Sequence, residues 1–192
     1  KMILTAITGS IGCGKTTISD VLREQGFLVY DIDKWVKLLY FKNDFLAVVR
    51  NYFPQAFSAD GEFNKKVLRN LVFNNPDKLK LLENLIHPFL TKRLKKIIRK
   101  NKNDGLVFVD AALLFEMGWD KYFDYIIVAD VDYEEQKKRV MERDNICAAD
   151  FEKINRSQMP QGEKVRKADF VINTGGTKGQ LIRNILCVIE GL

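Results

Sequence analysis

The sequence Gly9-Ser10-Ile11-Gly12-Cys13-Gly14-Lys15-Thr16-Thr17 decides which fold the chain predicts. It matches the phosphate-loop pattern G-x-x-x-x-G-K-[ST] and follows an apolar segment, residues 2–8, that is typical of a buried strand. A helical pattern begins at Lys15. Because strand, loop and helix occur in the order that a phosphate cradle needs, we interpret the match as a phosphate-binding loop and not as a chance glycine-rich turn.

Each residue type in this loop has a chemical reason. Gly9, Gly12 and Gly14 have no Cβ, so their backbone N–H groups can converge on an anion beside the positive end of the following helix. Lys15 can reach the β- and γ-phosphates of a nucleotide. The Thr16 hydroxyl can complete the oxygen shell of a magnesium ion. The sequence therefore predicts a site for ATP and Mg²⁺.

The bulk composition is that of an ordinary enzyme. The chain has 192 residues, 46% of them hydrophobic and 29% charged, enough for one large α/β domain or a core with an inserted subdomain. No apolar run approaches the roughly 20 residues that span a bilayer, so we expect a soluble, cytoplasmic protein. The net charge of +6 suits a ligand with several phosphates, but charge alone does not separate a nucleotide from a nucleic acid.

The cysteines indicate a reducing compartment. Cys13, Cys147 and Cys187 are far apart and form no C-x-x-C pair, which indicates neither a disulfide framework nor a zinc site. Cys13 precedes a helix N-terminus, where a thiol can be reactive. We favour the simpler interpretation, a small residue at a variable loop position.

Two carboxylates follow the second predicted strand. The first helix ends at Gln25-Gly26, and residues 27–30 form a short apolar segment, which completes a β-loop-α-β unit with parallel strands. Asp31 and Asp33 come next, where open parallel sheets bind their ligands. Asp33 is well placed to accept a proton from a substrate hydroxyl. The alternative is that either residue caps the next helix.

Residues 34–101 show several amphipathic helical patterns and no convincing strand, which predicts a helical block inserted into the sheet as a substrate-binding domain. Four stretches rich in turn-forming residues are expected to separate its helices: Pro54, Asp60-Gly61, Asn75-Pro76 and His87-Pro88. As the only histidine, before a proline, His87 is more typical of a helix junction than of catalysis. The basic stretch 92–102 fits the solvated side of a helix or, alternatively, a nucleic-acid contact without a base-reading motif.

Three more strands are predicted at residues 106–109, 125–129 and 170–173, the first of them after a turn at Asn103-Asp104-Gly105. Asp110 ends the first of these strands and is a candidate for the surroundings of a magnesium ion. Asn173 ends the last, in a position suited to the edge of an adenine.

Basic residues concentrate after the fourth strand. Arg139 and Arg143 lie one turn apart on one face of a predicted helix. Arg156 follows, and then Lys164, Arg166 and Lys167. A mobile basic segment here could serve as a lid that neutralises charge in phosphoryl transfer, with surface salt bridges as the alternative role.

Taken together, these motifs resemble the dephospho-coenzyme A kinase family along nearly the whole chain. The segments that match the family are residues 8–17, Asp31-Ile32-Asp33, Ile86-His87-Pro88, Leu113-Leu114-Phe115-Glu116, Arg139 with Arg143-Asp144, Arg156 with Gln158, and residues 169–175. The resemblance implies transfer of the ATP γ-phosphate to the ribose 3′-hydroxyl of dephospho-coenzyme A, the last step of coenzyme A biosynthesis. It implies small-molecule partners, without nucleic acid or membrane, and a monomer or weak homo-oligomer.

The resemblance also implies residue roles. ATP would contact Gly9, Ile11, Gly12, Cys13, Gly14, Lys15, Thr16, Thr17 and Asn173, with Thr16 on Mg²⁺. Catalysis would fall to Asp33, Lys15, Arg139 and Arg143, and acceptor binding to Asp31, Asp33, His87, Leu114 and Arg156. The chain departs from the family pattern at Ala112, usually proline, and at Lys65 and Lys66, where arginine is common.

The implied fold is an α/β P-loop kinase fold: a five-stranded parallel sheet flanked by helices, with an inserted helical substrate-binding domain and a helical lid. Its segments would be 1–33, 106–137 and 168–192 for the nucleotide-binding core, 34–105 for the substrate domain and 138–167 for the lid. The alternatives are another P-loop small-molecule or nucleotide kinase and, from a different class, a nucleotide-dependent nucleic-acid-binding or regulatory switch protein.

Overall fold

The computed structural model describes residues 2–73, 75–102 and 104–192, so Asn103 of the predicted turn lies outside the described residues. The chain divides into two compact units. One, the loop unit, comprises residues 1–31 and 101–192 and contains the sheet, and the other, the helical unit, comprises residues 32–100.

The described part of the loop unit contains one parallel sheet with the strand order β2-β3-β1-β4-β5. The strands are β1 (Ile3–Thr8), β2 (Leu28–Asp31), β3 (Leu106–Asp110), β4 (Tyr125–Asp130) and β5 (Phe170–Asn173). The five-stranded parallel sheet predicted from the sequence is confirmed. β1 lies in the middle, and five of its six residues are buried, so the loop that follows it starts from the centre of the sheet.

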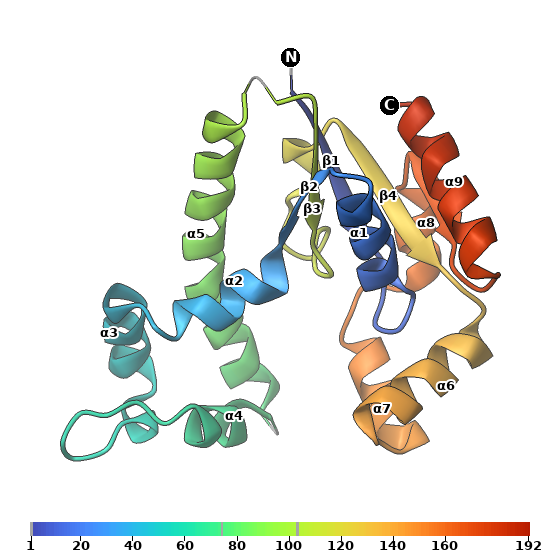
Figure 1. Cartoon of the computed structure of the whole chain (residues 1–192). Coiled ribbons are helices and arrows are strands. Elements are labelled where there is room, and N and C mark those ends of the chain that lie inside the picture. Colours follow the sequence, from blue (N-terminus) through green and yellow to red (C-terminus); the bar gives the residue numbers. More distant parts are fainter. Residues whose placement is uncertain (1, 74, 103) are drawn as a thin grey trace. The chain divides into compact units, whose positions relative to one another are not determined.

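Helices α1 (Lys15–Glu24) and α9 (Lys178–Glu190) lie side by side against the sheet (Figure 1). Ile18 of α1, Leu181 of α9 and Phe108 of β3 belong to one buried core, whose apolar contacts hold this layer. After β4 follow α6 (Tyr133–Asp144), α7 (Ala148–Arg156) and α8 (Gln161–Arg166), and a short 3₁₀ helix, Asp120–Tyr122, precedes β4.

The helical unit contains α2 (Ile32–Leu39), α3 (Asn43–Tyr52), α4 (Lys65–Phe73) and α5 (Pro76–Lys100), with a 3₁₀ helix at Pro54–Ala56. Aromatic rings join these elements. Phe45 of α3 is fully buried and meets Tyr40 and Phe89 edge to face, with ring centroids 5.4 and 5.3 Å apart. Such contacts pack helices together with little need for hydrogen bonds between side chains.

The predicted break at His87-Pro88 is wrong, because α5 runs through Pro88 without ending. Proline removes the hydrogen bond to the carbonyl four residues earlier, which belongs to Asn84. Asn84 and Pro88 are both exposed, so water can satisfy that carbonyl and the helix can continue.

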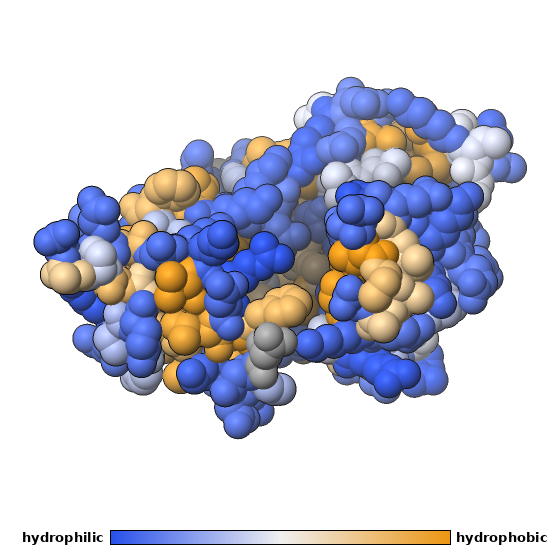
Figure 2. Space-filling view, turned by 90° about the horizontal axis from the view of Figure 1, so that it is seen from below, coloured by the Kyte–Doolittle hydropathy of each residue, from blue (hydrophilic) through white to orange (hydrophobic). Residues whose placement is uncertain are grey.

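The described helices include none with both the length and the apolar character that crossing a membrane requires. Seen from below, the surface is mostly hydrophilic and is broken by patches of apolar side chains (Figure 2).

Candidate active site

The loop after β1 adopts backbone angles that glycine favours. Gly12 and Gly14 have φ values of 79° and 88°. A Cβ on Gly12 would lie 2.5 Å from a methyl of Val140, and one on Gly14 would lie 2.7 Å from Oγ1 of Thr174. Neither distance is compatible with a side chain, so glycine at these positions lets the loop pack against α6 and against the turn after β5.

The loop borders a cavity of about 530 Å³. Its lining residues are Gly12, Gly14, Lys15, Thr16, Thr17, Arg139, Arg143, Thr174, Gly176, Lys178 and Leu181. The lining has four cationic side chains, and none of the described residues that line it is acidic. A cavity with this composition beside the N-terminus of α1 is suited to a polyphosphate.

The side chain of Lys15 folds back onto the backbone of the phosphate loop. Its Nζ donates to the carbonyl oxygens of Gly9, at 2.8 Å, and Ser10, at 3.5 Å. The ammonium group is thus held at the cavity lining by neutral acceptors. An anionic phosphate oxygen is a stronger acceptor for it than a peptide carbonyl.

Arg139 is oriented by its neighbours. Its Nε donates to Glu135 at 2.9 Å, and its two terminal nitrogens donate to Oγ1 and the carbonyl of Thr174 at 3.1 and 3.0 Å. Arg143 instead forms a two-pronged pair with Asp144, at 2.8 and 2.7 Å, which raises the pKa of Arg143 and lowers the pKa of Asp144. Both arginines line the cavity, as their spacing on α6 predicts.

Thr174 connects the loop with β5 and Arg139. Its hydroxyl donates to the carbonyl of Cys13 at 2.8 Å while accepting from Arg139. Cys13 itself is fully buried, and burial raises the pKa of its thiol to about 11. This favours the interpretation of Cys13 as a small packing residue over that of a reactive thiol.

Acidic residues also meet at the carboxyl end of the sheet. Asp31 ends β2 and pairs in register with Asp110, which ends β3. Asp110 accepts a hydrogen bond of 2.8 Å from the Ser19 hydroxyl. Ser19 lies one turn after Thr16 on α1, so Asp110 is tied to the helix that carries the candidate magnesium ligand.

Several predicted site residues lie apart from this cavity lining. Asn173 lines a second cavity of about 680 Å³, which shares Gly176 with the first. Leu114 is fully buried, and the side chain of Arg156 is 82% exposed, 4.0 Å from Glu152. The predicted loop residues that are not among those lining the first cavity are Gly9, Ile11 and Cys13.

Two predicted residues belong to the helical unit. Asp33 is the second residue of α2, exposed and in the first helical turn, where a negative charge is favourable. His87 lies in the middle of α5, and partial burial lowers the pKa of its imidazole. In the same unit, the ammonium of Lys65 lies 5.0 Å from the ring centre of Tyr40.

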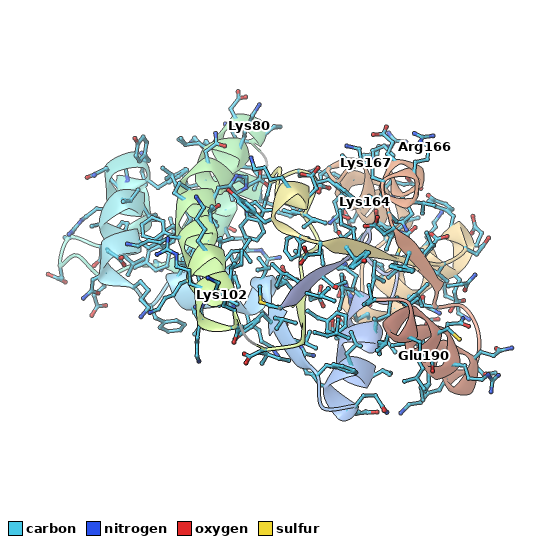
Figure 3. All side chains as sticks on the ribbon, turned by 90° about the horizontal axis from the view of Figure 1, so that it is seen from above. Lys80, Lys102, Lys164, Arg166, Lys167 and Glu190 are labelled. Atoms are coloured by element: carbon cyan, nitrogen blue, oxygen red, sulfur yellow. The ribbon has the colours of Figure 1, made fainter. Side chains whose placement is uncertain are left out.

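Lys164 does not have the solvent-facing position expected of a lid residue. Its side chain is fully buried, 3.1 Å from Glu116, and it donates to the carbonyl of Ala112 at 3.0 Å. Arg166 on the same helix and Lys167, which directly follows that helix, are exposed (Figure 3). α8 is therefore anchored to the 111–118 segment by a buried charge.

The side chains that hold the loop from outside are not among the residues predicted from the sequence motifs. Gln136 of α6 and Gln161 of α8 bond to the loop backbone, and the role of Thr174 as a connector was also missed. One signal was present for Gln136. It lies four residues before the buried Val140, on the inward face of an amphipathic helix, where a polar side chain needs a partner.

Comparison with known proteins gives a consistent result. A family model described as dephospho-CoA kinase matches residues 3–179. The dephospho-CoA kinase of Fusobacterium nucleatum is 35% identical over 186 residues, covering 96% of each chain, and that of Aquifex aeolicus is 35% identical over 188 residues, covering 97% of this chain and 95% of its own. The structure of the Campylobacter jejuni dephospho-CoA kinase has a TM-score of 0.72 at 26% identity, covering 99% of this chain and 96% of its own.

Proposed function

The chain belongs to the dephospho-CoA kinase family and is a kinase enzyme, and we propose that it transfers the γ-phosphate of ATP to the ribose 3′-hydroxyl of dephospho-CoA, giving CoA and ADP. The observation that carries the proposal is the cationic cavity between the phosphate loop and the arginines of α6. Phosphoryl transfer needs mainly alignment and stabilisation of charge, and these lining residues can provide both.

At the donor end, the amides of residues 12–17 would hold the phosphates, and Lys15 would move its ammonium group from the loop carbonyls to the β- and γ-phosphate oxygens. The Thr16 hydroxyl lines the cavity one residue after Lys15, where it can bind a magnesium ion. Mg²⁺ takes few protein ligands beside phosphate oxygens and water, so this donor set fits. When bound, the ion neutralises phosphate charge.

Arg139 would stabilise the charge of the transferring phosphoryl group from a fixed direction, since Glu135 and Thr174 already orient it. Arg143 is less constrained and 59% exposed, so it would add a second, adjustable cation. For the base of the nucleotide we propose the second cavity, where Asn173 presents an amide.

At the acceptor end, we assign to Asp33 the role of the base that takes the proton from the ribose hydroxyl. Its exposure leaves the carboxylate accessible to a substrate. Asp31 and His87 would contact the acceptor, and Arg156 has an accessible guanidinium for an anionic group. Leu114 has a buried side chain, so its contribution would come through the backbone of its loop.

Labelled ATP and a panel of acceptors test the proposal. The purified protein should transfer the label to dephospho-CoA, in a reaction that needs Mg²⁺, and should leave nucleoside monophosphates and simple sugars unlabelled. Labelling of a different acceptor alone would identify another small-molecule kinase. Hydrolysis without any acceptor, together with salt-sensitive binding of DNA or RNA, would point to a regulatory switch.

We further propose that the enzyme acts in the cytoplasm as a monomer or weak homo-oligomer. The wide separation of its cysteines, with no C-x-x-C pair, suits a reducing compartment. Size-exclusion chromatography with light scattering tests the oligomeric state, and a tight dimer would contradict it.

A further inference from the structure

Glutamine side chains hold the phosphate loop at two consecutive residues. The amide of Ser10 donates to Oε1 of Gln161, and the amide of Ile11 donates to Oε1 of Gln158, both at 2.9 Å. The carbonyl of Ile11 accepts from Nε2 of Gln136 at 2.7 Å. These glutamines, which we call the glutamine collar, lie at least 125 positions from the loop residues that they bond.

Each glutamine is restricted to one orientation of its amide. A backbone N–H only donates and a backbone carbonyl only accepts, so Gln158 must present its oxygen to Ile11 and Gln136 must present its nitrogen. Gln161 uses both groups, since its Nε2 donates to the carbonyl of Ala129 and to Asp130, each at 2.9 Å. It therefore fastens Ser10 to the end of β4.

The peptide groups on both sides of Ile11 are thus fixed immediately before Gly12, where the cavity lining begins. Gly12 and Gly14 allow many backbone conformations, so the loop needs external restraints to keep its amides directed at one point. Gln136 is only 3% exposed, and a buried amide that lost its partner would be costly.

We infer that the glutamine collar positions the phosphate loop for the nucleotide, and that its members are positioning residues for the kinase reaction. None of the three is among the described residues that line the cavity, so they act through the loop backbone. Gln158 lies in the connection between α7 and α8, and Gln161 is the first residue of α8, which makes loop geometry dependent on that segment. The inference rests on the proposed binding of ATP phosphates by this loop.

The donor and acceptor assignments give an atomic test. At position 158 the bond uses an oxygen, which Gln158→Glu keeps and Gln158→Leu removes. At position 136 the bond uses a nitrogen, so Gln136→Glu places an oxygen against the carbonyl of Ile11. The measurements are kcat and KM for ATP, the dissociation constant of ADP by calorimetry, and the thermal midpoint without ligand. Exposed Gln25, at the far end of α1, supplies the controls Gln25→Glu and Gln25→Leu.

We expect Gln158→Leu and Gln136→Glu each to lower kcat/KM for ATP and to weaken ADP binding, on the order of tenfold per lost bond. Gln158→Glu should recover most of the loss caused by Gln158→Leu, while both substitutions at Gln25 should leave kcat/KM unchanged. Parental kcat/KM in Gln158→Leu and Gln136→Glu would overturn the inference. Equal losses of kcat/KM in Gln158→Glu and Gln158→Leu would also overturn it. The same holds if kcat/KM falls only in proportion to a fall in the thermal midpoint, because the variants would then be losing stability and not loop position.

The calorimetric arm separates this inference from the proposed function. If the unsubstituted protein binds ADP but does not phosphorylate dephospho-CoA, the proposed acceptor is wrong. The differences in ADP affinity among the glutamine variants still test the collar in that case. If the parent is active and the pattern is missing, the collar alone is wrong. Should Gln136→Glu fail to fold, the Leu and Glu pair at position 158 decides the outcome.

Discussion

The phosphate loop (residues 9–17) and the helical unit (residues 32–100) are held by different kinds of contact. The loop is fixed by directional hydrogen bonds from Gln136, Gln158 and Gln161 and by Thr174. The helical unit is held by aromatic rings such as the stacked pair Tyr40 and Phe63, with centroids 5.7 Å apart, and the rings around Phe45.

The difference follows from what each part must do. A hydrogen bond weakens steeply when its angle or length changes, so a network of them fixes atomic positions. Apolar packing depends on buried area and fixes positions less strictly. The loop must aim several donors at small phosphate oxygens, whereas the helical unit must present a shape. Its surface also keeps large apolar side chains, including Phe41 at 83% and Phe73 at 58% exposure.

The largest effect should come from removing one chemical group in each region. Lys15→Ala and Asp33→Asn should each lower kcat by roughly 10³-fold or more, because one loses a cation on the phosphates and the other the proposed base. Steady-state kinetics and nucleotide calorimetry would separate the two. Only Lys15→Ala should also weaken ATP binding, because Asp33 is assigned to the acceptor.

Lys121→Ala and Asp60→Asn serve as controls, since both residues are exposed and neither is assigned to the site. Near-normal turnover in Lys15→Ala or Asp33→Asn would remove that residue from its proposed role.

The aromatic packing of the helical unit can be broken at its centre. Phe45→Ala should destabilise this unit by about 3–5 kcal/mol, because Phe45 is fully buried and its removal leaves a cavity among the neighbouring aromatic rings. Hydrogen exchange read by mass spectrometry would locate the effect in residues 32–100. Tyr52→Ala on the same helix, at a side chain 53% exposed, should change stability by less than about 0.5 kcal/mol. Equal effects of the two would contradict the packing argument.

The loop unit contains a buried charged side chain, Lys164, whereas the buried contacts around Phe45 in the helical unit are between aromatic rings. Lys164→Met should destabilise the loop unit by about 1–3 kcal/mol, since the carboxylate of Glu116 loses the charged partner that the fully buried Lys164 provides. Adding Glu116→Gln should recover part of that loss, because the unpaired charge is removed. Urea unfolding measures both, and Arg166→Met, on the exposed side of α8, is the control. No recovery in the double variant would argue against the ion pair.

The smallest effect concerns the single histidine. Burial lowers the pKa of His87 below its ordinary value of 6.5, so the folded unit favours neutral imidazole. This contribution to stability is complete above pH 6.5 and is lost as the pH falls from 6.5 through the folded pKa, because the unfolded chain takes up the proton first. An NMR titration of the only histidine should give a midpoint below 6.5, and a midpoint at or above that value would contradict the prediction.

The strands, the loop and the helix after it could be predicted because local patterns specify them. Apolar runs fix the strands, and the glycines with Lys15 fix the loop, so predicted and observed boundaries differ by a residue or two. Pro88 misled the prediction because a proline in a sequence does not reveal whether the carbonyl that it leaves unpaired faces water.

The bonds of the glutamine collar could not be predicted, because they join residues more than a hundred positions apart. The pattern around Gln136 indicates a polar side chain on an inward helix face, but it does not name the partner. Lys164 was misjudged for a similar reason. Its basic neighbours indicate a solvated face, and only the fold brings Glu116 to it. What pattern alone misses here is the set of long-range polar contacts that make the site rigid.

The burial of Cys13 has a consequence for oxidative stress. Oxidants attack thiolates that solvent can reach, and this sulfur is both protonated at neutral pH and fully enclosed. Peroxide damage to the chain should therefore begin at Cys147 and Cys187, which are both exposed. The phosphate loop should therefore keep the sulfur of Cys13 in reduced form.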